Sequence, residues 1–381
     1  MKSSEVKKGL EGVYVTESAL SYIDVENSKL YYVGYDIEDL VKYSSYEEVC
    51  YLLLHQRLPR RGELDEFVSK FADNRVLDDK VLETLKFVAR GKDVINTLAS
   101  HILLSYQGET GEAAIDPVRA RAHGIRIISQ MAILVANISR IRRGLDPIIP
   151  DRSMSHAASF LYIMRGEMPD AVESSIIDDI LIMHAEHGIP ASTFGALVTA
   201  STLSDLYSAI VSGLLTLKGP LHGGAAEATY RQLLEIGTPE NVDKWLTKAL
   251  ESKRKIMGFG HRVYRNYDPR AVIVKEIAIE VAKRKGGRVK ELLDISLLLE
   301  KEGVRRLGER GIYPNVDFWT PVVYAALDVP VDVLTAFFAS SRVVGWVAHI
   351  LDYWRDNRLI RPLHKYVGEL GRPYIPLEGR Y

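Results

Sequence analysis

Helical periodicity runs through most of this chain and leaves little room for another architecture. Apolar residues recur three and four positions apart in segments between residues 64 and 354, as in the stripe of Val172, Ile176 and Ile180. Strands do not alternate with helices, so a parallel sheet is not expected. The sequence therefore predicts a mainly α protein, and its 381 residues exceed the ~250–300 at which single cores stop growing, which favours two domains.

One segment near the N-terminus has the character of a strand pair. Residues 13–35 hold two runs rich in β-branched and aromatic residues on either side of a polar turn at Glu26–Lys29. We expect a short N-terminal β-hairpin there.

Charge and cysteine content narrow the function classes. The chain has 49 basic and 50 acidic residues, a formal charge of -1, whereas a nucleic-acid-binding protein usually carries a basic excess. Cys50 is the only cysteine, which excludes a disulfide within the chain and favours a reducing compartment. We expect no nucleic-acid partner.

A membrane or secreted location is not expected either. The first twelve residues contain no apolar run of the kind found in secretory signals. The longest mostly apolar stretch, residues 198–217, is interrupted by Asp205 and falls short of the ~18–20 clean apolar residues that span a bilayer. The sequence predicts a cytoplasmic protein without a membrane partner.

Three loops combine glycine or proline with a histidine or a carboxylate, namely residues 217–224, 257–270 and 311–321. Functional groups are often carried on loops that a rigid scaffold positions. In the first loop, His222 precedes a helix expected to begin at Ala225, whose dipole would favour the neutral imidazole. The alternative is a histidine that only closes a turn.

The other two loops each allow a structural reading beside the functional one. His261 follows Gly258, which could instead end a helix whose last turn holds the basic residues 253–255. Asp317 has largely apolar neighbours, which would raise its pKa and make it a stronger base. It could also be the N-cap of a segment beginning at Phe318.

His184 and His187 have a spacing that can bring two imidazoles to one metal. His184 continues the apolar stripe of its helix, however, and no third ligand is evident, so we reject a zinc site. His187 lies at the expected helix end and is available to a substrate.

Three arginines are candidates for binding an anion. Arg342 shares a helix face with apolar and aromatic residues, where an unpaired charge is costly, so it needs a protein carboxylate or an anionic ligand. Arg270 and Arg361 each adjoin a proline, and guanidinium groups match carboxylates with two parallel hydrogen bonds.

These segments together resemble the citrate synthase family, in the same order and over nearly the whole chain. The motifs are GPLHGGA at 219–225, MGFGHRVYRNYDPR at 257–270, YPNVDFWT at 313–320 and SRVVGWVAHILDYWRDNRLIRP at 341–362, with a further similar segment at 19–40. The chain looks like the short dimeric members, without the N-terminal extension of NADH-inhibited bacterial relatives.

The resemblance implies a fold and an assembly. The expected fold is a large helical domain of residues 1–219 and 329–381 with an inserted small helical domain of residues 220–328. The expected assembly is a homodimer whose active sites are shared between subunits. Neither a metal nor another cofactor is implied.

The resemblance also implies the site residues. The implied catalytic residues are His222, His261 and Asp317. The implied oxaloacetate or citrate ligands are His187, His261, Arg270, Arg342 and Arg361, the last of them reaching across the dimer interface. The implied CoA contacts are Ile256, Met257, Gly258, Phe259 and Gly260, with Arg265 at a phosphate.

The implied reaction condenses acetyl-CoA with oxaloacetate and water to citrate and CoA. Asp317 would take the methyl proton, His222 would stabilise the enolate oxygen, and His261 would protonate the new alkoxide. Two alternatives stay open: a 2-methylcitrate synthase that uses propionyl-CoA, and a non-catalytic helical scaffold.

Overall fold

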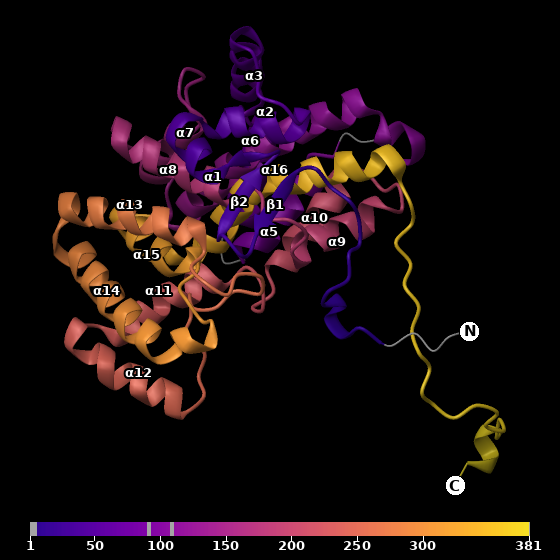
Figure 1. The fold of residues 1–381 in the computed structure, drawn as a ribbon. Helices are drawn as coiled ribbons and strands as arrows, with labels where there is room; N and C mark the ends of the chain where they lie inside the picture. The colour runs from indigo at the N-terminus through magenta and orange to yellow at the C-terminus, as the bar shows by residue number, and fades with distance from the viewer. Residues whose placement is uncertain (1–5, 90–92, 107–109, 381) are drawn as a thin grey trace.

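The computed structural model describes residues 6–89, 93–106 and 110–380 and is mainly α-helical (Figure 1). The helices are α1 (Ile37–Tyr43), α2 (Tyr46–His55), α3 (Arg61–Asn74), α4 (Asp79–Val88), α5 (Val94–Leu104), α6 (Pro117–Arg142), α7 (His156–Arg165), α8 (Ala171–His184), α9 (Ala191–Ala200), α10 (Leu206–Leu217), α11 (Ala225–Ile236), α12 (Val242–Glu251), α13 (Pro269–Lys285), α14 (Gly287–Leu307), α15 (Val316–Ala326) and α16 (Leu334–Tyr353). The predicted fold class is confirmed.

The predicted hairpin is present but shorter than expected. Strands β1 (Ser21–Asp24) and β2 (Lys29–Tyr32) pair antiparallel, and a third strand, β3 (Tyr35–Asp36), extends the sheet in the order β1-β2-β3. The Asp24 carboxylate accepts the Asn27 N–H in the turn. Residues 13–20 lie outside the strands. Tyr14 is almost fully exposed, and the segment meets the sheet only at its end, where the Leu20 carbonyl accepts the Val33 N–H at 2.9 Å.

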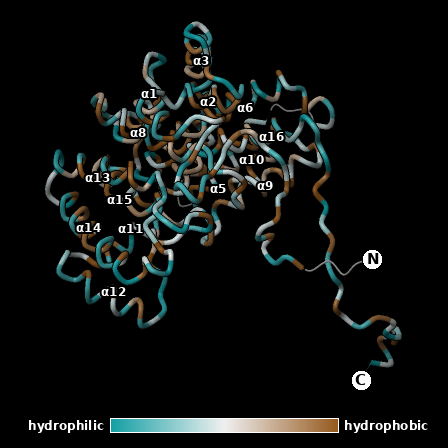
Figure 2. The backbone as a smooth tube through the Cα atoms, in the orientation of Figure 1, coloured by the Kyte–Doolittle hydropathy of each residue, from teal (hydrophilic) through white to brown (hydrophobic). Residues whose placement is uncertain are grey.

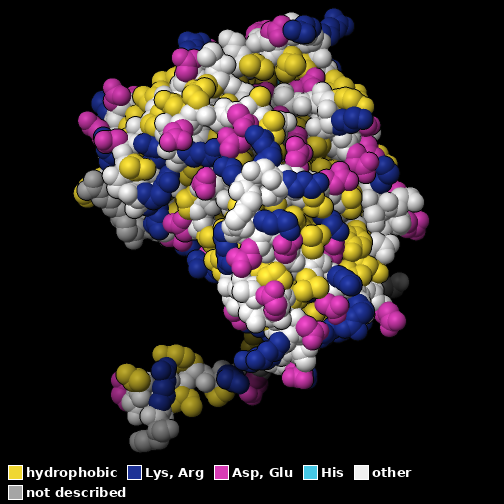
Figure 3. All heavy atoms as spheres, turned by 90° about the vertical axis from the view of Figure 1, so that its left-hand side faces the viewer, with side chains coloured by type: hydrophobic (Ala, Val, Ile, Leu, Met, Phe, Trp, Pro, Cys, Tyr) yellow, Lys and Arg dark blue, Asp and Glu magenta, His cyan; other side chains and the backbone are white. Residues whose placement is uncertain are grey.

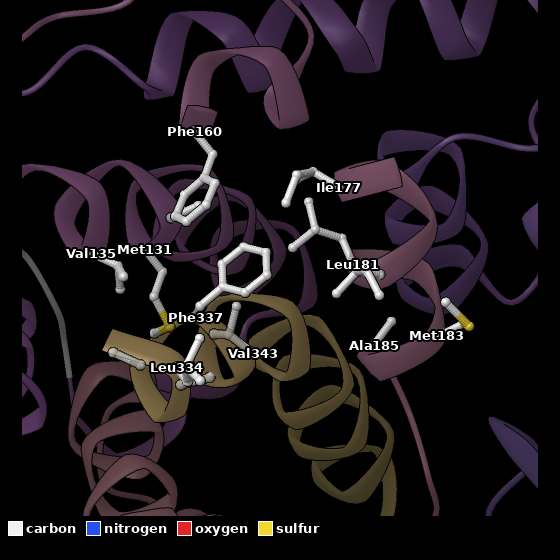
Figure 4. Packing of buried hydrophobic residues seen from close by; sticks show 14 of the residues in the cluster. Met131, Val135, Phe160, Ile177, Leu181, Met183, Ala185, Leu334, Phe337 and Val343 are labelled. Carbon is white, nitrogen blue, oxygen red and sulfur yellow. The ribbon is translucent and has the colours of Figure 1, made fainter. Parts of the chain in front are cut away.

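The core is built around α16, which packs against α6, α8 and α9. In Figure 4, Met131 and Val135 of α6, Phe160 of α7 and Leu181 of α8 surround Phe337 of α16, and the rings of Phe160 and Phe337 stack at 4.4 Å. Residues 117–142 and 331–356 are long and apolar enough to cross a membrane. However, 94% and 89% of the most apolar part of each segment is buried inside the structure. Their hydrophobicity therefore serves the core.

Helices α11 to α15 form a group of their own. They pack mainly on one another and meet the rest of the chain chiefly through α16 and α8. In Figure 1 this group, drawn in salmon and orange, lies to one side of the helices that surround α16. Loops at the junction of the two groups carry the residues discussed below.

After α16, Asn357 and Ile360 still bond to Ser201 of the body, and residues 361–380 then project from it as a largely extended segment (Figures 1 and 3). Figure 2 shows hydrophobic residues along this segment, and its exposed apolar side chains include Leu363, Val367, Leu370, Tyr374 and Leu377. On the face of the body in Figure 3, basic and acidic side chains are intermixed.

Candidate active site

His222 lies in the turn between α10 and α11, and its ring contacts the N-terminus of α9. The backbone N–H of Ser192 donates to Nε2 at 3.1 Å, and the Ser192 hydroxyl lies 2.8 Å from the same atom. Nε2 is therefore the acceptor, which places the ring proton on Nδ1. The dipole that acts most directly on this histidine is that of α9, because the first amides of α9 point at the ring.

Burial, and then the charge of Arg342, lower the pKa of His222 to about 4. The imidazole is therefore neutral at pH 7 and still has one N–H to donate. A neutral donor is suited to stabilising a developing negative charge without transferring its proton early.

His261 is also held as a neutral donor. The backbone N–H groups of Val263 and Tyr264 both donate to its Nδ1 at 3.1 Å, so the ring proton is on Nε2. Burial and then the charge of Arg270 lower the pKa of His261 to about 4. The alternative in which Gly258 ends the preceding helix is wrong, since α12 already ends at Glu251.

Gly258 has a different structural role. Its φ is +79°, and an added Cβ would lie 2.8 Å from Cα of Phe318. The glycine therefore allows the 257–260 loop to lie directly against the first turn of α15.

Asp317 is in the first turn of α15 but is not its N-cap. That position belongs to Asn315, whose side chain accepts the Asp317 N–H at 3.0 Å. The alternative of Asp317 as an N-cap is therefore wrong, and its carboxylate is not engaged in capping. Burial raises the pKa of Asp317 to about 6, even though the charge of Arg270 opposes this shift. Such a carboxyl is a stronger base than an exposed aspartate.

His187 lies in the loop between α8 and α9, beside His261. The two ring centroids are 5.2 Å apart, and the Nε2 atom of His187 is buried without a hydrogen-bond partner in the part of the chain that the structure describes. His184 is a core residue, as expected: its side chain is buried and its Nδ1 lies 2.8 Å from the Ile180 carbonyl oxygen. The described residues contain no group of three potential metal ligands.

Arg342 carries a buried charge without an ion pair among the described residues. Its Nε donates to the His184 carbonyl at 2.7 Å, and the guanidinium lies 4.9 Å from the Phe338 ring centroid. Burial lowers the pKa of this guanidinium, and the charge of Glu186 opposes that effect. Of the two partners expected for Arg342, a protein carboxylate in direct contact is not present, which favours an anionic ligand.

Arg270 differs from Arg342 because it has a carboxylate partner. At the start of α13, its Nε and Nη2 donate to Asp268 at 3.0 and 2.8 Å. Burial alone would lower the pKa of Arg270, but the ion pair raises it above its ordinary value. Asp268 is fully buried and also accepts the Arg270 N–H as the N-cap of α13, so the arginine is fixed in place.

The charges of Arg342 and Arg270 influence the pKa values of the predicted site residues. Burial is the largest influence on the pKa values of His222, His187 and Asp317, and the charge of Arg342 lowers each of them. The charge of Arg270 acts in the same way on His261, His187 and Asp317. Residues from three loops and from the first turn of α15 thus lie in the field of one pair of arginines.

Two predicted arginines lie apart from this group. Arg361 is exposed on the projecting C-terminal segment, and Arg265 is exposed on the loop before α13. Within one chain, the structure therefore does not bring Arg361 to the other substrate ligands.

The predicted CoA loop has most of its backbone groups already bonded. Gln232 binds both the N–H and the carbonyl of Met257, at 2.8 and 3.2 Å. Asn315 donates to the carbonyls of Gly258 and Gly260, and the Gly260 N–H donates to Tyr313. Ile256 is buried and its carbonyl accepts the Phe259 N–H. The loop is therefore rigid and is tied to α11 and to the start of α15.

Sequence reasoning missed several residues that support this site. Ser192 orients His222, Asp268 holds Arg270, and Glu186 accepts Ser21 Oγ, Gly188 N–H and His349 Nε2 in the loop that carries His187. The Asp-Pro pair before Arg270 could have predicted an N-cap. No local signal predicts the contacts of Ser192 with His222 or of Glu186 with Ser21 and His349, which join residues far apart in the sequence.

These features are those expected of a helical enzyme whose site holds a carboxylate base, neutral imidazole donors and buried arginines suited to a small anion. The comparisons with known proteins name the family. The family model described as "Citrate synthase, C-terminal domain" matches residues 9–363. A citrate synthase of Saccharolobus solfataricus is 41% identical, with 99% of this chain and 100% of the relative covered.

A solved structure of citrate synthase from Thermoplasma acidophilum, in a ternary complex with carboxymethyl coenzyme A and oxaloacetate, superposes with a TM-score of 0.92. It is 36% identical and covers 99% of this chain and 100% of its own. A 2-methylcitrate synthase of Mycobacterium tuberculosis is 38% identical over 96% of this chain and 91% of the relative. The chain belongs to the citrate synthase family and is an acyltransferase.

Proposed function

We propose that citrate synthesis, the activity of this family, is carried in this chain by Asp317, His222 and His261. The observation that supports it best is the half-buried Asp317, with a pKa raised to about 6, in the field of the same arginines as two neutral histidines. The substrates are oxaloacetate and acetyl-CoA, and the complex named for the Thermoplasma enzyme supports both.

The first step forms the nucleophile. Asp317 removes a proton from the methyl group of acetyl-CoA, and negative charge develops on the thioester oxygen. The Nδ1–H of His222 donates to that oxygen. Because His222 is neutral, it stabilises the enolate by hydrogen bonding.

The second step forms the carbon–carbon bond. The enolate carbon attacks the ketone carbon of oxaloacetate, and Nε2–H of His261 protonates the oxygen as it becomes a hydroxyl. Arg342, Arg270 and His187 bind the substrate carboxylates and fix the orientation of the ketone. Water then hydrolyses citryl-CoA, which releases citrate and CoA, and these steps require no metal.

We propose that residues 220–328 form the small domain and close over oxaloacetate. The separate packing of α11 to α15 supports this division. CoA would lie along the 256–260 loop, with Arg265 at a phosphate. Because the loop is bonded to Gln232 and Asn315, it would move with its domain as one unit. Closure excludes water until both substrates are bound.

We infer that the enzyme is a homodimer and that Arg361 reaches the partner's site. The exposed apolar residues of the projecting C-terminal segment support this, because a contiguous exposed apolar surface marks a protein contact. Sedimentation equilibrium should give twice the chain mass of 42.8 kDa. Replacing Leu363, Val367 and Leu370 by serine should weaken the dimer, and a monomeric wild-type protein would contradict the inference.

Thiol release tests the function itself. Mixing the protein with acetyl-CoA and oxaloacetate should release CoA, which a non-catalytic scaffold would not do. Because one relative is a 2-methylcitrate synthase, propionyl-CoA is the alternative substrate to compare with acetyl-CoA. One methylene in a pocket discriminates by about 10–200-fold, so we expect kcat/KM for acetyl-CoA to exceed that for propionyl-CoA within this range. A preference for propionyl-CoA would assign the chain to 2-methylcitrate synthesis.

We also infer a cytoplasmic location. The support is chemical: Cys50 is the only cysteine in the sequence and is buried as a free thiol, as suits a reducing compartment.

A further inference from the structure

We propose that the hydroxyl of Tyr264 binds oxaloacetate directly, by donating a hydrogen bond to a substrate carboxylate beside Arg270. The inference rests on the proposed function, because it names a further contact within the same site. Tyr264 is neither among the site residues predicted from the sequence nor used in the proposed catalytic steps.

The ring of Tyr264 packs against both histidines of the proposed oxaloacetate site, which also contact each other. Its centroid is 4.8 Å from that of His261 and 5.7 Å from that of His187. Its backbone N–H donates to Nδ1 of His261. The side chain is 1% exposed, so the position of the hydroxyl is determined by these contacts.

The hydroxyl oxygen is buried and has no hydrogen-bond partner among the described residues. An unpaired buried hydroxyl is unfavourable, so a native fold that retains one usually uses it. Burial raises the pKa of this phenol well above its ordinary value, and the charge of Arg270 opposes the shift. The group is therefore a protonated donor close to a cation.

The neighbouring groups also have unused hydrogen-bonding capacity. Nε2 of His187 is buried without a partner, and Arg342 has no ion pair in the described chain. A substrate with two carboxylates supplies the acceptors that these groups require. Tyr264 would add a hydrogen bond to a charged acceptor, which is among the stronger kinds in proteins.

The test is Tyr264→Phe, which removes only the hydroxyl. Oxaloacetate binding, measured by isothermal titration calorimetry on the full-length protein, should weaken by about 10–100-fold. The KM for oxaloacetate should rise in parallel, while the KM for acetyl-CoA should change less than about twofold. The free variant should unfold at no lower temperature than wild type, since it loses an unpaired buried group.

Tyr267→Phe is the matched control, because this residue lies on the same loop and its hydroxyl interacts with Glu300 of α14. It should leave both KM values unchanged. An unchanged oxaloacetate affinity in Tyr264→Phe would overturn the inference, as would an equal loss of affinity for both substrates, which would indicate a structural role. Failure of wild type to bind oxaloacetate or release thiol would instead overturn the proposed function.

Discussion

Replacing Asp317 by asparagine should lower kcat by about 10²–10⁴-fold and leave the fold intact, because general base catalysis contributes rate factors of this size. Asparagine has the same shape but cannot accept the methyl proton. The helix should tolerate it, because Asn315 and not Asp317 caps α15. Steady-state thiol release gives kcat, and circular dichroism checks the fold. The KM for oxaloacetate should change little, since Asp317 does not bind its carboxylates.

The pH dependence follows from the same carboxyl. The base works only when ionised, and its pKa is raised to about 6 by burial. Below about pH 6, kcat/KM of wild type should therefore fall tenfold per pH unit, and it should level off above. The residual activity of the asparagine variant should lack this acid limb.

A control for Asp317 is available at the other end of the same helix. Asp328 follows α15, is exposed, and has a φ of +55°, which asparagine tolerates well. Asp328→Asn should keep full activity. Near-normal turnover in Asp317→Asn would contradict the assigned base, whereas an equal loss in both variants would point to damage of α15.

Replacing His222 by alanine should lower kcat by about 10²–10³-fold, the usual effect of removing one oxyanion donor. The structure predicts this because Ser192 fixes the proton on Nδ1, and burial together with Arg342 keeps the ring neutral. The variant leaves an amide of α9 uncapped, which costs about 0.5–2 kcal/mol of stability. Kinetics and thermal unfolding of the variant separate these effects.

Leu221→Ala is the control for His222, because Leu221 is the adjacent residue in the same turn and is 96% exposed. It should retain wild-type kcat. A His222→Ala variant with normal kcat, or one whose loss of activity is matched by Leu221→Ala, would remove His222 from the oxyanion role.

Sequence reasoning selected the candidate reactive groups because the proposed chemistry depends on residue types held in loops rich in glycine and proline. It left open whether Asp317 is a base or an N-cap, since Asp is a good N-cap and only the local backbone shows that the helix begins at Val316 and is capped by Asn315. It also extended the hairpin too far, because β-propensity at residues 13–20 had no strand to pair with.

Other features depend on contacts that no local pattern encodes. Ser192 is hydrogen-bonded to His222, which lies 30 residues further along the sequence. Tyr46 of α2 donates to the Ser340 carbonyl of α16, which is 294 residues away in the sequence. The buried, unpaired hydroxyl of Tyr264 is recognisable only once its surroundings are placed. Arg361 requires a second chain, and it stays a prediction.

The most direct test is a crystal structure of the protein with oxaloacetate and carboxymethyl coenzyme A, the pair named for the Thermoplasma complex. The proposed mechanism predicts Nδ1 of His222 and the Asp317 carboxylate beside the acetyl-like end of the CoA analogue. It also predicts Nε2 of His261 within hydrogen-bond distance of the ketone oxygen, and Arg342 paired with a substrate carboxylate. Ligands bound elsewhere, or any of the three catalytic groups pointing away from both of them, would contradict it.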